Sequence, residues 1–130
     1  MSNKDTTNKP RILIIEDDEL LSSMYFTKFS KEGFDVLFCD NGEAGLSIAK
    51  KERPNIILLD ILLPGINGFE VLKKLKEDGA TALIPVILLT NVSEPAEMEK
   101  GMKLGAVDYL VKVFHVPTEV VEKVKARLHL

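Results

Sequence analysis

The sequence predicts an α/β fold in which a five-stranded parallel sheet lies between two layers of helices. Five short apolar runs are spaced along the 130 residues, and a segment with helical periodicity follows each of them. Three of the runs are continuously apolar, which is typical of strands buried on both faces of a parallel sheet. Regular alternation of strand and helix favours right-handed crossovers with helices on both faces.

The expected strands are identified by their apolar cores. The three continuous runs are residues 11–15, 55–60 and 85–90, and two shorter runs at residues 34–38 and 107–111 complete the set. The first run is followed directly by acidic residues, the second ends in Asp60, and the third ends in Thr90. The strand ends therefore carry polar groups that a buried strand does not need for its own stability.

Helical periodicity fills the intervals between these strands. Near the N-terminus, apolar residues recur at three- and four-residue spacing at Leu20, Leu21, Met24, Tyr25 and Phe29. In the last segment the same spacing places one apolar face at Val120, Val121, Val124 and Leu128. Such stripes are typical of helices that pack one face on a core.

Capping residues indicate where the other helices begin and end. Asn41 is the expected cap of the second helix, and the third runs from about residue 67 to residue 78. We expect Ser93 to cap the fourth helix, with Pro95 in its first turn and Gly105 at its end. Pro117 opens the fifth.

The composition excludes several classes of protein. We expect residues 1–9 to form a disordered lead and residues 10–130 to form one domain, with no room for an appended output domain. A net charge of −3 does not favour direct nucleic-acid binding, and no apolar stretch predicts membrane insertion or a signal peptide. The single cysteine, Cys39, cannot form an internal disulfide, which fits a cytoplasmic protein, and we interpret it as a small buried residue.

Polar side chains gather at the carboxyl ends of the expected strands. They are Glu16, Asp17 and Asp18 after the first strand, Asp60 at the third, Thr90 and Asn91 at the fourth, and Lys112 after the fifth. In a parallel sheet these ends meet at one edge, which is where open α/β sheets bind ligands. The sequence therefore predicts a functional site at this edge.

The chemistry of these groups favours phosphoryl transfer. Carboxylates about 4 Å apart repel by roughly 4 kcal/mol per pair at an effective dielectric constant near 20, so either one of them is protonated or a cation neutralises them. Oxygen ligands without thiol or imidazole favour Mg²⁺, Mn²⁺ or Ca²⁺. A divalent cation, the ammonium of Lys112 and the hydroxyl of Thr90 around Asp60 would suit an aspartate nucleophile.

These residues resemble the receiver domains of bacterial two-component response regulators, including the single-domain chemotaxis-type regulators. The resemblance extends from about residue 11 to residue 128. It lies in the first strand with its acid pair, in the stretch from Asp60 to Gly68, in Leu88-Leu89-Thr90, and in the stretch from Gly105 to Lys112. It implies a flavodoxin-like (βα)5 three-layer sandwich with strand order 2-1-3-4-5.

The resemblance also implies a role for each matching residue. Asp60 would accept the phosphoryl group, and Thr90 and Lys112 would contact it. The Mg²⁺ ligands would be Asp17 directly, Glu16 mainly through water, Asp60, and the backbone carbonyl of Leu62. Tyr109 would be an aromatic switch coupled to Thr90.

The implied partner is a histidine kinase or a histidine phosphotransfer protein. The chain would assist its own phosphorylation and dephosphorylation without being an enzyme that turns over a substrate. The face built by the fourth helix, the fifth strand and the fifth helix would then bind a downstream protein. Cations on these helices form either a solvated surface or a docking or dimer face: Lys100, Lys103, Lys123, Lys125 and Arg127.

Four residues depart from the family pattern. Val113 follows Lys112 where the family usually has proline, so we expect a trans bond there and some change in how Lys112 is aimed. Asn91 stands where the family prefers a very small residue. Leu62 and Val92 are apolar and cannot orient a hydrolytic water, so we expect a long-lived aspartyl phosphate.

Three other interpretations stay open on the sequence alone. A haloacid-dehalogenase-type phosphatase carries an Asp-x-Asp pattern after its first strand. In this sequence Asp60 lies on the third expected strand, and Leu62 stands where the second aspartate of that pattern would be. A flavodoxin-like flavin binder needs a phosphate loop where the acid pair lies. A pseudo-receiver would keep the fold for protein binding only.

Overall fold

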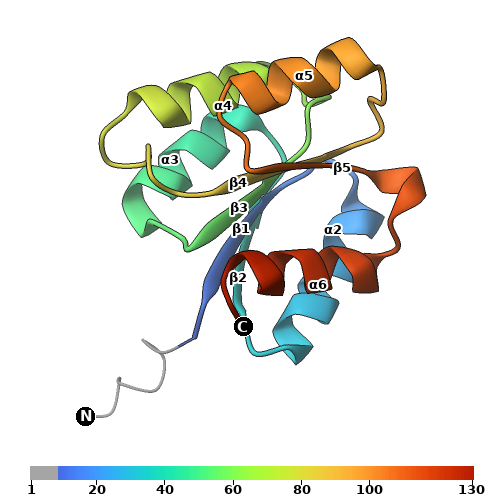
Figure 1. Cartoon of the computed structure of the whole chain (residues 1–130). Helices are drawn as coiled ribbons and strands as arrows, with labels where there is room; N and C mark the ends of the chain where they lie inside the picture. Colours follow the sequence, from blue (N-terminus) through green and yellow to red (C-terminus); the bar gives the residue numbers. More distant parts are fainter. Residues whose placement is uncertain (1–8) are drawn as a thin grey trace.

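The computed structural model describes residues 9–130 and shows a five-stranded parallel sheet between two layers of helices (Figure 1). The strands are β1 (Arg11–Ile15), β2 (Asp35–Cys39), β3 (Ile56–Leu59), β4 (Val86–Thr90) and β5 (Asp108–Val111). Their order is β2-β1-β3-β4-β5, and every neighbouring pair is parallel. The predicted fold class and strand order are confirmed. The lead expected at residues 1–9 lies, except for Lys9, outside the described residues.

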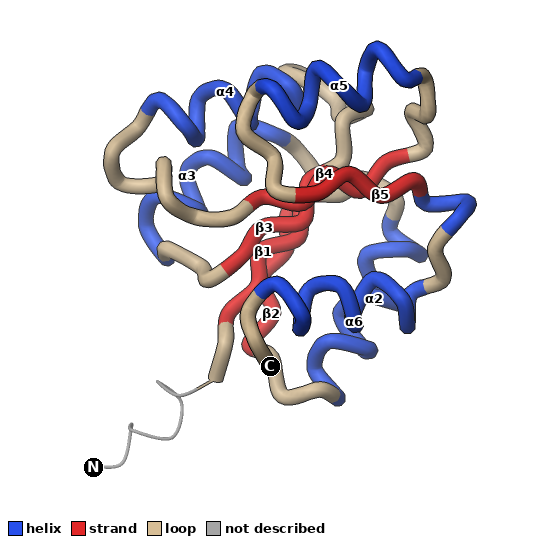
Figure 2. Tube along the Cα trace, viewed as in Figure 1, coloured by secondary structure: helices blue, strands red, loops and turns tan. Residues whose placement is uncertain are grey.

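Helices cover both faces of the sheet, as Figure 2 shows. They are α2 (Glu19–Lys31), α3 (Gly42–Glu52), α4 (Gly68–Glu77), α5 (Pro95–Lys103) and α6 (Pro117–Arg127). A short 3₁₀ turn, η1 (Lys112–Phe114), follows β5. The helices α3, α4 and α5 lie on one face, and α2 and α6 lie on the other.

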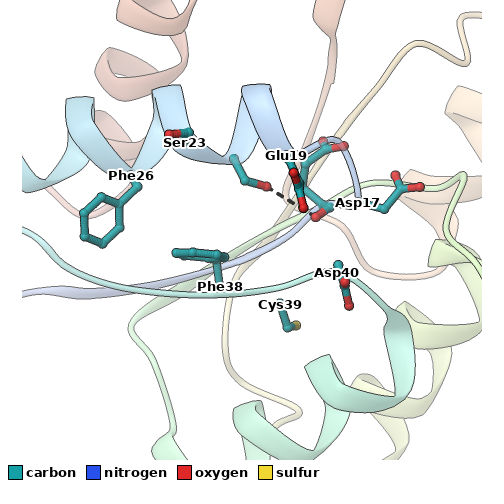
Figure 3. A pocket seen from close by; sticks show the side chains of 9 residues that line it. Asp17, Glu19, Ser23, Phe26, Phe38, Cys39 and Asp40 are labelled. Carbon is teal, nitrogen blue, oxygen red and sulfur yellow. Dashed lines mark hydrogen bonds between the residues drawn. The ribbon is translucent and has the colours of Figure 1, made fainter.

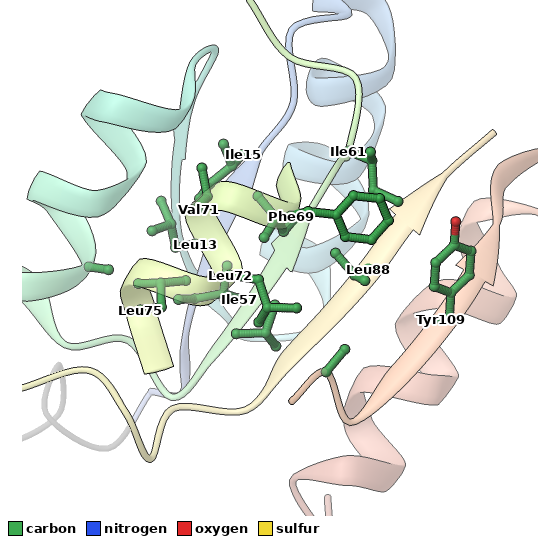
Figure 4. Close-up of a cluster of buried hydrophobic side chains, with 14 of the residues drawn as sticks. Leu13, Ile15, Ile57, Ile61, Phe69, Val71, Leu72, Leu75, Leu88 and Tyr109 are labelled. Carbon is green, nitrogen blue, oxygen red and sulfur yellow. The ribbon is translucent and has the colours of Figure 1, made fainter. Parts of the chain in front are cut away.

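Two apolar clusters hold the layers together because successive strand residues point to opposite faces. On β1, Leu13 and Ile15 pack toward α3 and α4, whereas Ile12 and Ile14 pack toward α2 and α6. Figure 4 shows the first of these clusters. All residues of β3 and β4 are buried, which explains why their sequences are continuously apolar.

The apolar stripe predicted for the first helix is only partly correct. Tyr25 and Phe29 are buried, but Leu20 and Met24 are exposed, because α2 turns just one narrow face to the sheet. The face predicted for the last helix is confirmed for Val120, Val121 and Val124, which are buried, whereas Leu128 caps the helix and is only half-buried against the same cluster.

Side-chain caps begin three of the helices. The carboxylate of Asp18 accepts a hydrogen bond from Leu21 N (3.0 Å), the amide oxygen of Asn41 accepts one from Ala44 N (2.8 Å), and Asn67 begins α4 in the same way. Each bond satisfies an amide that has no partner inside its helix. The cap predicted at Asn41 is confirmed.

The cap predicted at Ser93 is wrong. The N-cap residue of α5 is Glu94, whose side chain makes no cap hydrogen bond, and Pro95 is the first helical residue. A proline forces the residue before it into an extended conformation, which is the conformation of an N-cap, and Glu94 has φ −66° and ψ 133°. Proline thus fixed the start of the helix one residue later than the serine suggested.

Two further observations concern all of the described residues. No peptide bond in the described residues is cis, so the trans bond expected after Lys112 is confirmed. Within residues 9–130, no helix is both long and apolar enough to cross a membrane.

Candidate functional site

The parallel register brings the carboxylates of the first and third strands to one edge of the sheet. Ile15 on β1 pairs with Leu59 on β3, so the residues that follow them, Glu16 and Asp60, are neighbours. The strand ladder continues past both strands, because Asp60 N donates to Ile15 O (3.1 Å) and Glu16 N donates to Cys39 O (3.0 Å). The backbone therefore fixes the positions from which both acidic side chains extend.

The carboxylate of Asp60 is buried, and both of its oxygens accept hydrogen bonds. Its residue is only 6% exposed. Oδ1 accepts hydrogen bonds from Ile61 N (2.7 Å) and Leu62 N (3.4 Å), and Oδ2 accepts one from Lys112 Nζ (2.8 Å). Hydrogen bonds to both oxygens favour a single orientation of the carboxylate at the sheet edge.

Lys112 joins two acidic residues. Its ammonium lies 2.8 Å from Asp60 Oδ2 and 2.6 Å from Glu16 Oε1. Burial alone would lower the pKa of this lysine, but hydrogen bonds to the two carboxylates raise it above its ordinary value. Burial raises the pKa of Glu16, and the nearby Asp60 raises it further against the opposing effect of Lys112.

Asp17 completes a cluster of three acids. Glu16, Asp17 and Asp60 each offer a carboxylate oxygen, and the three oxygens lie within 4.8 Å of one another. With Lys112 the formal charge of the group is −2, from three carboxylates and one ammonium. Hard oxygen donors at this spacing, with a negative charge not yet balanced, fit a divalent cation. The site can therefore hold a metal through the predicted side chains.

Thr90 and Tyr109 lie on adjacent strands and are linked through one backbone segment. Thr90 is fully buried at the end of β4, and its Oγ1 accepts a hydrogen bond from Val92 N (3.3 Å). The hydroxyl of Tyr109 on β5 donates to Val92 O (2.6 Å), and burial raises the pKa of this tyrosine. Val92 thus connects the two residues for which a coupled switch was predicted.

The residues that depart from the family pattern have different surroundings. Leu62 is 64% exposed beside Asp60, Asn91 is exposed, and Val92 is half-buried. Val113, at 73% exposed, lies in the turn after Lys112, whose ammonium still reaches Asp60. The effects predicted for these residues on reactivity stay predictions.

The fold requires glycine at position 68, and sequence reasoning did not predict this. A Cβ at this position would lie 2.2 Å from Asp60 O and 2.7 Å from Ile61 Cα, which are backbone atoms, and Gly68 N donates to Ile61 O (2.8 Å). The start of α4 is therefore pressed against the segment that carries Asp60. The glycine at the first helical position after the Asn67 cap was the feature in the sequence that could have indicated this contact.

Comparison with known proteins removes two of the three interpretations that the sequence left open. A model of the response regulator receiver domain family matches residues 12–125. The chain belongs to this family. It is a receiver domain of a response regulator in two-component signalling, which excludes the phosphatase and flavin-binder interpretations.

The sequence of one curated relative supports this assignment. The chain is 36% identical over 122 residues to the DNA-binding response regulator MtrA of Mycobacterium tuberculosis, an alignment that covers 94% of this chain and 52% of MtrA. The chain therefore spans about half the length of that relative.

Solved structures share the fold. A putative response regulator from Chloroflexus aurantiacus is 30% identical, with a TM-score of 0.86 over 95% of this chain and all of that one. The receiver domain of the sensor histidine kinase PA1611 from Pseudomonas aeruginosa, solved with magnesium coordinated in its active-site cleft, has a TM-score of 0.82 over 91% of this chain and 96% of that one. At 22% identity, this second likeness concerns the fold alone.

Proposed function

We propose that Asp60 accepts a phosphoryl group from a phosphohistidine in a histidine kinase or a histidine phosphotransfer protein. The observation that carries this proposal is the ammonium of Lys112, which lies 2.8 Å from the buried carboxylate of Asp60 in a cluster of three acids. In the transfer, an oxygen of Asp60 forms the new P–O bond while the P–N bond of the donor breaks. The electron pair of that bond returns to the imidazole.

The neighbouring residues would stabilise charge that develops on the phosphoryl oxygens. Lys112 can donate hydrogen bonds to these oxygens as they move, because its flexible stem holds an ammonium with three donors beside Asp60. Thr90 would turn its hydroxyl, which now accepts from Val92 N, toward the phosphoryl group and donate a hydrogen bond. Donors that lie where charge develops in the transition state commonly contribute a large share of the catalysis.

A divalent cation, most suitably Mg²⁺, would be held by Asp17, Glu16 and Asp60, with the backbone carbonyl of Leu62 as a further ligand. When bound, it would neutralise the cluster and stabilise the charge of the transferring group. PA1611, with magnesium in its cleft, is a precedent on the same fold.

The phosphorylated state would be transmitted through Thr90 and Tyr109. Movement of the Thr90 hydroxyl would release Val92 N, and Tyr109 would exchange its hydrogen bond to Val92 O for the space that Thr90 leaves. The surface formed by α5, β5 and α6 would then bind a downstream protein. A receiver of this kind assists its own phosphorylation and dephosphorylation. We also propose that the protein lies in the cytoplasm, where the free thiol of Cys39 would stay reduced.

The test is the intact mass of the protein after incubation with phosphoramidate, with and without Mg²⁺. We expect one added phosphoryl group that requires Mg²⁺. The adduct should be lost in Asp60→Asn and kept in Asp40→Asn, a control that replaces an exposed acid nearby. An adduct that persists in Asp60→Asn would assign the acceptor elsewhere. No adduct with any donor would favour a pseudo-receiver.

A further inference from the structure

A groove of about 690 Å³ opens between the first half of α2 and the end of β2, beside the acidic cluster (Figure 3). Its volume lies in the range of pockets that hold small ligands. Glu16 and Asp17 form part of its lining and belong to the cluster around Asp60. The rest of the lining comes from residues that have no role in the proposed phosphoryl transfer.

Two aromatic rings form the apolar wall of this groove. Phe26 on α2 and Phe38 on β2 are 43% and 52% exposed, and their rings meet edge to face with centroids 5.9 Å apart. Aromatic side chains contribute most when they are buried, so two adjacent exposed rings at a groove indicate a surface that a partner covers.

The other wall is acidic. Four carboxylates line the groove, and its lining contains no lysine, arginine or histidine. Glu16 is paired with Lys112, but within residues 9–130 the carboxylates of Asp17, Glu19 and Asp40 form no ion pair. Figure 3 shows Glu19 and Asp40 at the same end of the groove, with the two phenylalanines further along.

This combination of walls selects the occupant. A second copy that docked with the same groove would place carboxylates against carboxylates, and an anionic ligand would be repelled for the same reason. A guanidinium group can bind to both walls at once, because its flat face stacks on aromatic rings while its N–H groups donate hydrogen bonds to carboxylates. We propose that this groove is a docking site for a partner protein that inserts an arginine between the Phe26–Phe38 pair and the carboxylates of Glu19 and Asp40.

The experiment uses blocked tripeptides as probes and two-dimensional NMR of the ¹⁵N-labelled protein. The acetyl-Leu-Arg-Leu amide should shift the amide resonances of Phe26, Phe38 and Cys39 saturably at saturating Mg²⁺, which occupies the metal site. The citrulline counterpart has the same shape without the charge. It should bind at least about two- to five-fold more weakly, because it loses one exposed cation–π contact and also the attraction to the carboxylates of Glu19 and Asp40.

Variants separate the two walls. Phe38→Leu keeps an apolar surface but removes the ring, so the preference for arginine over citrulline should fall, although the carboxylates still favour arginine. Glu19→Gln should weaken the arginine peptide alone. Phe114→Ala replaces an aromatic that is 70% exposed outside the groove and should change neither affinity. All three positions are exposed, so the fold should be retained.

Three results would overturn the proposal. The first is equal binding of the arginine and citrulline peptides. The second is binding that disappears when Mg²⁺ is added, which would place the guanidinium in the metal site. The third is an arginine preference that Phe38→Leu leaves unchanged. None of these results depends on whether Asp60 is phosphorylated.

Discussion

Neutralising Asp17 should stabilise the metal-free protein and weaken its response to Mg²⁺. The carboxylate of Asp17 lies within 4.8 Å of those of Glu16 and Asp60, so Asp17→Asn removes two repulsive pairs. Each pair repels by about 3.5 kcal/mol at an effective dielectric constant of 20 and by about 0.9 kcal/mol in bulk water. Because Asp17 is exposed and is also attracted by Lys112, the lower value is the better guide.

The expected gain in the free energy of unfolding without metal is therefore about 1 kcal/mol, or roughly 3–5 °C in Tm for a domain of this size. Added Mg²⁺ should stabilise the parent protein more than Asp17→Asn. At a concentration 100-fold above its Kd, the cation stabilises the parent protein by about 2.7 kcal/mol. A ten-fold weaker affinity in Asp17→Asn reduces that gain to about 1.4 kcal/mol.

Thermal unfolding in EDTA and across a MgCl₂ series measures both quantities. The matched control is Asp40→Asn, because Asp40 is an exposed acid outside the cluster whose Oδ1 accepts from Asn41 Nδ2, and asparagine keeps an oxygen there. The reasoning fails if Asp17→Asn lowers the Tm in EDTA, or if both variants gain the same stability from Mg²⁺.

Three further predictions concern Gly68, the apolar flanks of Asp60, and Cys39. Gly68→Ala should lower the stability by about 1–3 kcal/mol in chemical denaturation, because its Cβ would meet backbone at 2.2 Å, whereas Gly79→Ala, with nothing within 4 Å, should be near neutral. Leu62→Asn combined with Val92→Glu should accelerate loss of the Asp60 phosphoryl group by up to about 10²-fold after donor removal, and an unchanged lifetime would count against a water-positioning effect. Cys39 is half-buried rather than buried, and this burial raises the pKa of its thiol to about 11, so a smaller fraction of the thiol is ionised at pH 8. Iodoacetamide should therefore react about 100-fold more slowly than with the urea-unfolded protein, and equal rates would contradict a shielded thiol.

The backbone of the site was predictable, whereas the contacts between its side chains were not. Continuous apolar runs fix parallel strands, and parallel strands place Glu16, Asp60 and Lys112 at one edge wherever the side chains point. Sequence spacing could not show that the ammonium of Lys112 lies between two carboxylates, because a four-carbon stem permits many positions. The close contact of Gly68 with Asp60 was hidden for a similar reason, since it depends on the distance between a helix and a loop.

Helix α2 shows a second limit of sequence patterns. An apolar residue at helical spacing is equally consistent with a core position and with an exposed one, and the pattern did not separate Tyr25, which is buried, from Leu20 and Met24, which are exposed. Phe26 did not fit the stripe at all, yet it meets Phe38 from a strand at the edge of the sheet. Contacts between elements at an edge depend on the packing angle of the helix, which residue spacing does not determine.

The double contact of Lys112 has a consequence for the proposed transfer. Both oxygens of Asp60 already accept hydrogen bonds, Oδ1 from backbone amides and Oδ2 from the ammonium. The amides of Ile61 and Leu62 belong to the backbone and cannot leave without moving the loop, whereas the ammonium of Lys112 can shift on its flexible stem without any movement of the backbone. Oδ2 is therefore the oxygen more readily freed to form a bond to phosphorus. The contact between Lys112 and Glu16 would keep the ammonium within reach of the phosphoryl oxygens while Oδ2 reacts, so Glu16 would serve the transfer as an anchor for the lysine as well as a metal ligand.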